Sequence, residues 1–327
     1  MDSARSKEQL EKQKLKNNKM KKNIKQIATC LQIGIVSCFL FAIGNNVYAQ
    51  DSTSAKSKPK IESVRNTFLG NILIDNQTIM VPSKKTFEFT IQHRFGTINN
   101  GYTDMYGIFA SANMRLGWNY TPIDNLQLGV GICKENMQWD GNVKYAIIQQ
   151  AVSNGCPVSV TYFGDMAVST LPMNGNFVRD ADRISYFNQL MVARKITSRF
   201  SVQVAPSLSY FNNVEGYVSS DGSTKPKMKN SHYAIAVMGR YKLNKAISVI
   251  ANYDQPLTQH PTNNPNPNIS FGIDLGTAGH SFQLFAGNYQ SILQQSNNFY
   301  NQNDYLLSRY CIGFNITRRW YDFFSKK

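Results

Sequence analysis

The sequence predicts an all-β protein, a transmembrane antiparallel up-and-down β-barrel of about 12 strands with both termini in the periplasm. Three observations predict it. Apolar residues recur at every second position, the opposite face of each strand is small or polar, and the connections alternate between short and long. The composition agrees, because 12% aromatic residues argue against a mostly disordered chain. The chain also lacks the several long apolar runs that a membrane protein with several spanning helices would need.

Residues 1–49 are predicted to be a secretory signal peptide. Residues 1–25 carry nine cations and three acids, and an apolar run follows from Ile27 to Gly44. Val47 and Ala49 then occupy the two key positions of a small-residue cleavage site. An uncleaved membrane anchor is the alternative, but the run is short for a span. Met20 opens a more usual signal sequence, so we hypothesise that it is the true start.

Much of the net positive charge lies in this predicted signal peptide, here called the leader. The whole chain has 35 Lys and Arg against 20 Asp and Glu, a net +15 that suggests a nucleic-acid or membrane-surface partner. Removing the leader's nine cations and three acids leaves 26 and 17, a net +9, so a nucleic-acid partner is not expected. The remaining cysteines, Cys133, Cys156 and Cys311, are odd in number and lack CxxC spacing. We therefore expect no metal, disulfide framework or cofactor.

Residues 50–85 are predicted to be a periplasmic lead-in segment, and residues 86–327 the barrel. In the first strand, Phe87, Phe89 and Ile91 alternate with Glu88 and Thr90. Eleven further segments repeat this pattern, the last of them over residues 310–316. A soluble sandwich or lipocalin-like barrel would also alternate. However, strands of about ten residues suit a tilted membrane crossing, and a face rich in Gly, Ser, Asn and Gln suits a lumen.

The lengths of the connections distinguish an outer-membrane barrel from a soluble sandwich or lipocalin-like barrel. Five short turns alternate with six longer loops, although the second of these loops is only moderately long. The short turns fall at 121–125, 150–157, 195–199, 244–245 and 276–279, and the longer loops at 96–110, 134–140, 165–183, 212–231, 255–268 and 289–304. Outer-membrane barrels have short periplasmic turns and longer extracellular loops, whereas a sandwich has no reason to keep this asymmetry.

Several motifs resemble those of a known family. The first strand reads Phe-Thr-Ile-Gln-His-Arg-Phe-Gly over residues 89–96, and it is followed by Arg115–Tyr120 and by Trp139–Tyr145. This chain resembles a family of uncharacterised membrane-bound β-barrel proteins, a domain of unknown function, most specifically over residues 87–165. The resemblance implies a barrel in the bacterial outer membrane and supplies no substrate or catalytic residue.

The alternation also predicts which charged side chains face the lumen. They are Glu88, Arg94, Arg115, Lys144, Arg240, Asp274 and Arg309. An excess of cations among them would favour anions in a pore. Alternatively, they would form a closed salt-bridge network that plugs the lumen. His93, beside Arg94, is predicted on the lipid side or at the rim, and the two together are a candidate ligand contact at the outer mouth.

The function that follows is an integral outer-membrane barrel of unknown specific role, a small channel or a structural or binding barrel rather than an enzyme. The alternative is a barrel enzyme acting on lipid or ester substrates, but no nucleophile motif accompanies His93, His232, His260 or His280. The expected partners are outer-membrane lipids, the barrel assembly machinery, and a small solute or surface glycan.

Overall fold

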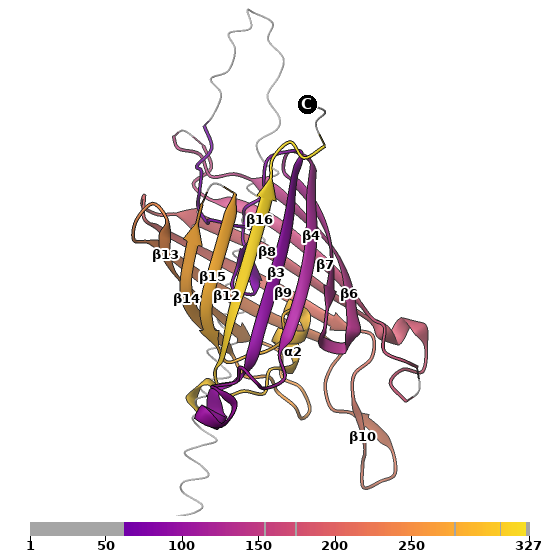
Figure 1. Cartoon of the computed structure of the whole chain (residues 1–327). Coiled ribbons are helices and arrows are strands. Elements are labelled where there is room, and N and C mark those ends of the chain that lie inside the picture. Colours follow the sequence, from indigo (N-terminus) through magenta and orange to yellow (C-terminus); the bar gives the residue numbers. More distant parts are fainter. Residues whose placement is uncertain (1–61, 154, 174, 278, 308, 325–327) are drawn as a thin grey trace, which may run out of the picture. The chain divides into compact units, whose positions relative to one another are not determined.

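Twelve antiparallel strands close into one barrel (Figure 1). The computed structural model describes residues 62–324 apart from 154, 174, 278 and 308, so the predicted signal peptide lies outside the described residues. The strands are β3 (Thr86–Thr97), β4 (Asn113–Ile123), β5 (Leu126–Cys133), β6 (Gln138–Ile148), β7 (Ser159–Ser169), β8 (Ile184–Lys195), β9 (Phe200–Phe211), β12 (Ser231–Lys242), β13 (Ile247–Pro256), β14 (Asn268–Gly276), β15 (His280–Gly287) and β16 (Cys311–Trp320). Each pairs with its neighbours in sequence, and β16 pairs with β3 to close the ring. The predicted closed antiparallel barrel of twelve strands is confirmed.

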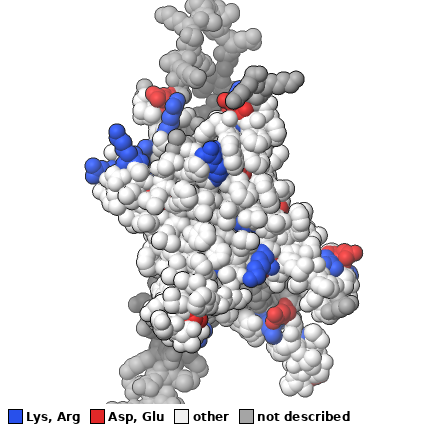
Figure 2. Space-filling view, viewed as in Figure 1, with Lys and Arg blue, Asp and Glu red and all other residues white. Residues whose placement is uncertain are grey.

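The wall has an apolar exterior and a mainly polar interior. In β3 every second residue from Thr86 is buried, while Phe87 and Phe89 point outward. Exterior side chains such as Val130 and Phe271 are each 55% exposed, although both are apolar. Figure 2 shows few charged side chains over the middle of the wall. This is the surface that a barrel presents to lipid. No helix in the described part of the chain is long and apolar enough to cross a membrane.

The two ends of the barrel differ. One end, here called the short-turn end, carries the five short connections, the start of β3 and the end of β16. The other, the long-loop end, carries the six longer ones. These contain η1 (Ile98–Asp104), η2 (Glu135–Met137), η3 (Asp180–Arg183), the hairpin β10 (Gly216–Val218) and β11 (Thr224–Pro226), α2 (Gln294–Tyr300) and η4 (Tyr305–Leu307). The predicted alternation of turn and loop lengths holds except around β6, where the connection at the long-loop end, 134–137, is shorter than the one at the short-turn end, 149–158.

A segment that precedes the first wall strand fills the lumen. Residues 67–82, here called the plug, enter from the short-turn end, turn at a hairpin of β1 (Ile72–Leu73) and β2 (Asn76–Gln77), and return to β3. The sequence predicted a periplasmic lead-in over residues 50–85, which includes this stretch. The structure corrects that placement for the plug, whose side chains Phe68 and Leu73 are only 1% exposed.

An apolar patch on the lumen wall explains why the plug lies inside. Phe68, Leu73, Ile74 and Ile79 of the plug belong to one buried cluster with wall residues. The wall members include Phe163, Phe187, Met191, Met238, Ile250 and Phe285, all of which occupy inward positions. A purely polar lumen would not hold apolar side chains. These inward apolar residues therefore supply the hydrophobic surface against which the plug packs.

A second segment enters the lumen from the long-loop end. Residues 288–303, here called the inward loop, follow β15 and include α2 (Figure 1). Its residues from Gln294 to Phe299 are buried although most are amides or Ser. Phe299 packs on Phe211 of β9, with ring centroids 4.6 Å apart. The lumen is therefore occupied from both ends by two different parts of the chain.

Candidate functional site

The plug and the inward loop meet at the buried carboxylate of Asp75. Tyr289 Oη donates to Asp75 Oδ1 (2.8 Å) and Asn297 Nδ2 donates to Oδ2 (2.6 Å). Gln294 Nε2 donates to the backbone carbonyl of Asp75 (2.7 Å), and Asn252 of β13 donates to Oδ1 (3.2 Å). Three of these four donors come from the inward loop. The tip of the plug is thus held by the segment that enters from the opposite end.

The turn that presents Asp75 is held in a costly backbone conformation. Ile74 has φ 61°, in the left-handed region that a β-branched residue rarely adopts, at a cost of about 1–3 kcal/mol. The wall holds it there. Gln283 Oε1 accepts from its N–H (3.0 Å), and its carbonyl accepts from Asn315 Nδ2 (2.6 Å) and Arg94 Nη2 (3.2 Å). Strain maintained by surrounding hydrogen bonds is typical of functional segments.

Two of the predicted lumen residues lie in the half of the lumen nearer the long loops. Arg94 is 1% exposed, contacts the plug through Ile74, and places its guanidinium carbon 4.4 Å from the centre of the Phe285 ring. Arg115 forms a buried ion pair with Asp140, in which Nε donates to Oδ1 at 2.8 Å, and it also donates to Gln92 Oε1 (3.1 Å).

Four more lie near the short-turn end. Glu88 accepts from Arg319 Nε (2.8 Å) and from Asn71 Nδ2 of the plug (2.9 Å). Lys144 Nζ donates to the Asn71 carbonyl (2.9 Å). Arg240 donates to Ser248 Oγ (3.1 Å) and to the Asn66 carbonyl (3.3 Å), and Asp274 accepts from Ser281 Oγ (3.1 Å). Most of these predicted charges therefore bind the plug or its entrance.

Arg309 is the exception among the seven. It is exposed and lies in the connection before β16, which begins only at Cys311. The alternation assigned Arg309 correctly to the same parity as Cys311, but the strand does not extend that far. Its assignment to the lumen is therefore wrong.

Several buried acids were missed by the sequence analysis. Asp140, Asp165 and Asp254 all lie at inward positions of their strands, so the same alternation could have found them. Including them, the strands bury four cations (Arg94, Arg115, Lys144, Arg240) and five acids (Glu88, Asp140, Asp165, Asp254, Asp274), and Arg319 brings the cations to five. The predicted excess of inward cations is not observed in the described strands.

The histidines are placed in different environments. His93 faces outward, as expected, between the rings of Phe95 and Phe314, whose centroids lie 4.4 and 5.1 Å away. His232 and His260 stack on each other at the long-loop end, 9° from parallel, and both contact Phe299 of the inward loop.

Hydrogen bonds define the protonation of this histidine pair. The backbone N–H of Lys229 donates to His260 Nδ1 (2.9 Å), so the proton of a neutral His260 is on Nε2. Nε2–H then donates to His232 Nδ1 (2.9 Å). A second proton on His260 would set two N–H donors against each other. The pair, and its contact with Phe299, therefore requires neutral rings.

Acid is expected to loosen the inward loop through this pair. Burial, and then the charge of Lys229, lowers the pKa of His260 below its usual 6.5. Because the folded pKa is the lower one, the stabilising contribution is complete above about pH 6.5 and is lost as the pH falls toward the folded pKa. The hydrogen-exchange protection factors of residues 288–303, which correct for the intrinsic pH dependence of amide exchange, should fall between pH 7.5 and pH 5. In a His260→Phe variant, which keeps a ring against Phe299, exchange should not depend on pH in this way. Equal pH dependence in both proteins would contradict the assignment.

The barrel and its lining define a class of protein. A closed antiparallel barrel with an apolar exterior, a polar lumen and alternating short and long connections is an integral outer-membrane β-barrel protein. Residues 68–320 match the family described as "Membrane bound beta barrel domain (DUF5777)", and the chain belongs to this family. The match begins within the plug, at Phe68, so the family's domain includes the lumen segment as well as the wall.

Solved structures match the chain only at low identity. A NanC porin is 10% identical, with 72% of this chain and 98% of that chain covered and a TM-score of 0.43. A KdgM porin is 9% identical over 71% and 98%, with a TM-score of 0.41. An outer membrane channel from Pseudomonas putida F1 is 12% identical over 74% and 97%, with a TM-score of 0.43. No curated protein matches the chain.

Proposed function

We propose that this outer-membrane barrel is a small channel that the plug and the inward loop close, and that solute passes when these two segments rearrange. The observation that carries the proposal is the junction at Asp75, where segments from the two ends of the lumen hold each other. A barrel with a purely structural role needs only wall side chains to fill its interior. Here the filling is a separate segment of chain.

The geometry of the plug supports movement. Both of its legs lie at the short-turn end, where Val64 N–H donates to the Gln150 carbonyl (2.7 Å) and Lys85 N–H to the Thr121 carbonyl (2.7 Å). A hairpin with both ends on one side can be withdrawn without threading. Many of its contacts with the wall are single hydrogen bonds to amide or hydroxyl side chains, such as Gln203 Nε2 to the Gln77 carbonyl (2.8 Å). Water can replace bonds of this kind at modest cost.

The proposal includes an orientation and excludes catalysis. Short turns are typical of the periplasmic side, so both termini and the entrance of the plug would face the periplasm. Enzymatic hydrolysis would need a base oriented by a third group beside a nucleophile. In the described part of the chain, His232 and His260 bond each other and His280 bonds Arg318, and none of these bonds orients a base toward a hydroxyl. Lipids of the outer membrane and the barrel assembly machinery remain the expected partners.

Recordings in planar bilayers test the channel directly. The full-length protein should remain closed most of the time and show discrete, brief conductance steps, because the closed arrangement is extensively hydrogen-bonded. The steps should become more frequent when the Asp75 junction is weakened by Tyr289→Phe, which removes one donor to that carboxylate. If neither protein shows a step at any voltage, the barrel is not a channel.

A further inference from the structure

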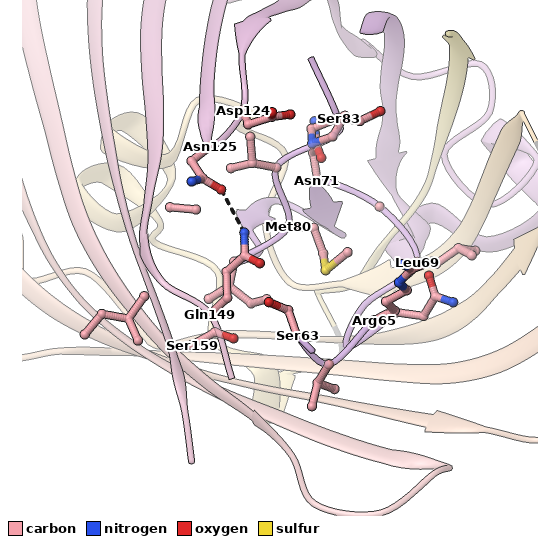
Figure 3. Close-up of a pocket in the computed structure, with 18 of the residues that line it drawn as sticks. Ser63, Arg65, Leu69, Asn71, Met80, Ser83, Asp124, Asn125, Gln149 and Ser159 are labelled. Atoms are coloured by element: carbon pink, nitrogen blue, oxygen red, sulfur yellow. Dashed lines mark hydrogen bonds between the residues drawn. The ribbon is translucent and has the colours of Figure 1, made fainter. Parts of the chain in front are cut away.

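The plug does not fill the lumen completely. A partly open cavity of about 1070 Å³ lies at the short-turn end between the plug and the adjoining wall (Figure 3). Both legs of the plug line it, through residues such as Leu69, Asn71 and Met80. Asn125, Gln149 and Ser159 line it from the barrel side. Its size matches or slightly exceeds that of typical small-molecule sites, which measure about 300–1,000 Å³.

Two buried donors without a full set of acceptors contact Asn71, a residue that lines this cavity. Asn71 forms part of the lining, and Lys144 and Gln127 lie directly behind it, 1% and 3% exposed. Lys144 Nζ, with three donors, has one hydrogen bond among the described residues, to the Asn71 carbonyl. Gln127 accepts from Asn71 Nδ2 (2.9 Å), while its own Nε2 finds no acceptor in the described chain. Buried donors without acceptors cost about 1–3 kcal/mol each, so such groups usually await a ligand or water.

The charged residues that line the cavity are two acids, Glu62 and Asp124, and two cations, Arg65 and Arg319. Behind the lining, Lys144 adds a cation that makes no ion pair with any described residue, and the carboxylate of Glu88 is bonded to Arg319. Leu69, Ile79, Met80 and Ile148 contribute apolar surface to the same lining. The cavity therefore combines cationic and donor groups behind Asn71 with an amphipathic body.

We propose that this cavity binds an organic anion, a small carboxylate with a partly apolar body. The carboxylate would accept from Lys144 Nζ and Gln127 Nε2, and the body would lie along Leu69 and Met80. Reaching Lys144 requires the anion to replace the Asn71 carbonyl, so binding weakens a contact that holds the plug to the wall. As a solute site the inference rests on the proposed channel function, and it names the class of solute that would release the plug.

Calorimetric titration of the purified full-length protein in detergent tests the site. Phenylacetate is the probe, and phenylacetamide, of nearly the same shape without the charge, is its control. We expect saturable binding of phenylacetate, at least about tenfold tighter than that of the amide. Lys144→Gln should weaken phenylacetate binding at least tenfold. Lys245→Gln, which removes the same charge from an exposed turn at the same end, should leave binding unchanged.

A second variant guards against misfolding of Lys144→Gln. Ala146 is buried and lines the cavity, so Ala146→Phe places a ring in it without changing charge and should also weaken binding. No saturable binding of phenylacetate to the wild type, or equal binding of acid and amide, would overturn the proposal. Conductance is measured separately. If a barrel without its plug conducts but phenylacetate does not bind, only the anion site fails, whereas binding without any conductance refutes the channel and leaves the site.

Discussion

Replacing residues 67–82 with a linker of about six Gly and Ser residues is expected to open the barrel permanently, with ion conductance at least about tenfold above that of the intact protein. The reason is geometric. The plug is the segment that crosses the lumen from the short-turn end, and the inward loop is anchored on its tip through Tyr289, Gln294 and Asn297. Removing the plug removes the obstruction and the anchor together. Single-channel recording in planar bilayers measures the change.

The wall is expected to survive this replacement. The twelve strands form a closed ladder in which β16 pairs with β3, and the plug contributes no strand to that ladder. Circular dichroism and heat-modifiable migration in gels check that the barrel is intact. The matched control replaces residues 216–226, the exposed hairpin of β10 and β11, with a similar linker and should leave conductance unchanged. Indistinguishable conductance of the plugless and intact barrels would show that the plug is not the barrier.

Asp75→Ala is expected to produce the second large effect, a drop of about 3 kcal/mol in the free energy of unfolding. The substitution leaves Tyr289 Oη, Asn252 Nδ2 and Asn297 Nδ2 without the carboxylate that accepts from them. An unsatisfied buried donor costs about 1–3 kcal/mol, and partial rearrangement or entry of water reduces the sum. Urea unfolding in lipid vesicles, followed by tryptophan fluorescence, measures the change.

The same variant should also open more often, because both lumen segments lose their common anchor. Asp221→Ala is the control. Asp221 also bonds three groups, Ser223 N and Oγ and Lys225 Nζ, but it lies in the exposed β10–β11 turn. It should change neither unfolding nor open probability. A wild-type unfolding midpoint for Asp75→Ala would mean that the junction at the plug tip does not stabilise the closed lumen.

The strands of the wall could be predicted almost completely from the sequence because every strand has the same two environments, one on each face. Lipid outside and lumen inside impose a strict alternation, so Glu88, Arg94 and Arg115 were correctly placed from position alone. Arg309 failed because alternation gives the direction of a side chain but not the point at which a strand begins. The acids Asp140 and Asp254 obey the same alternation.

The plug could not be predicted in the same way. Its two strands are each two residues long, too short for any periodicity to appear. The informative signal lay instead in the part of the lumen wall that the plug contacts. Phe163, Phe187 and Met191 are large apolar residues on the lumen side of β7 and β8. Apolar side chains at inward positions of a predicted barrel indicate that an apolar segment packs against them inside the lumen. The partner is distant in sequence, and only the fold brings it into contact.

Arg319 connects the closure of the ring to its contents. It belongs to β16, bonds Glu88 across the seam to β3, and donates through Nη1 to the Leu69 carbonyl of the plug (3.2 Å). The final strand therefore gains its full set of bonds only when the N-terminal hairpin is already in the lumen. We therefore expect that a barrel assembled without its plug closes with a weaker seam at that point.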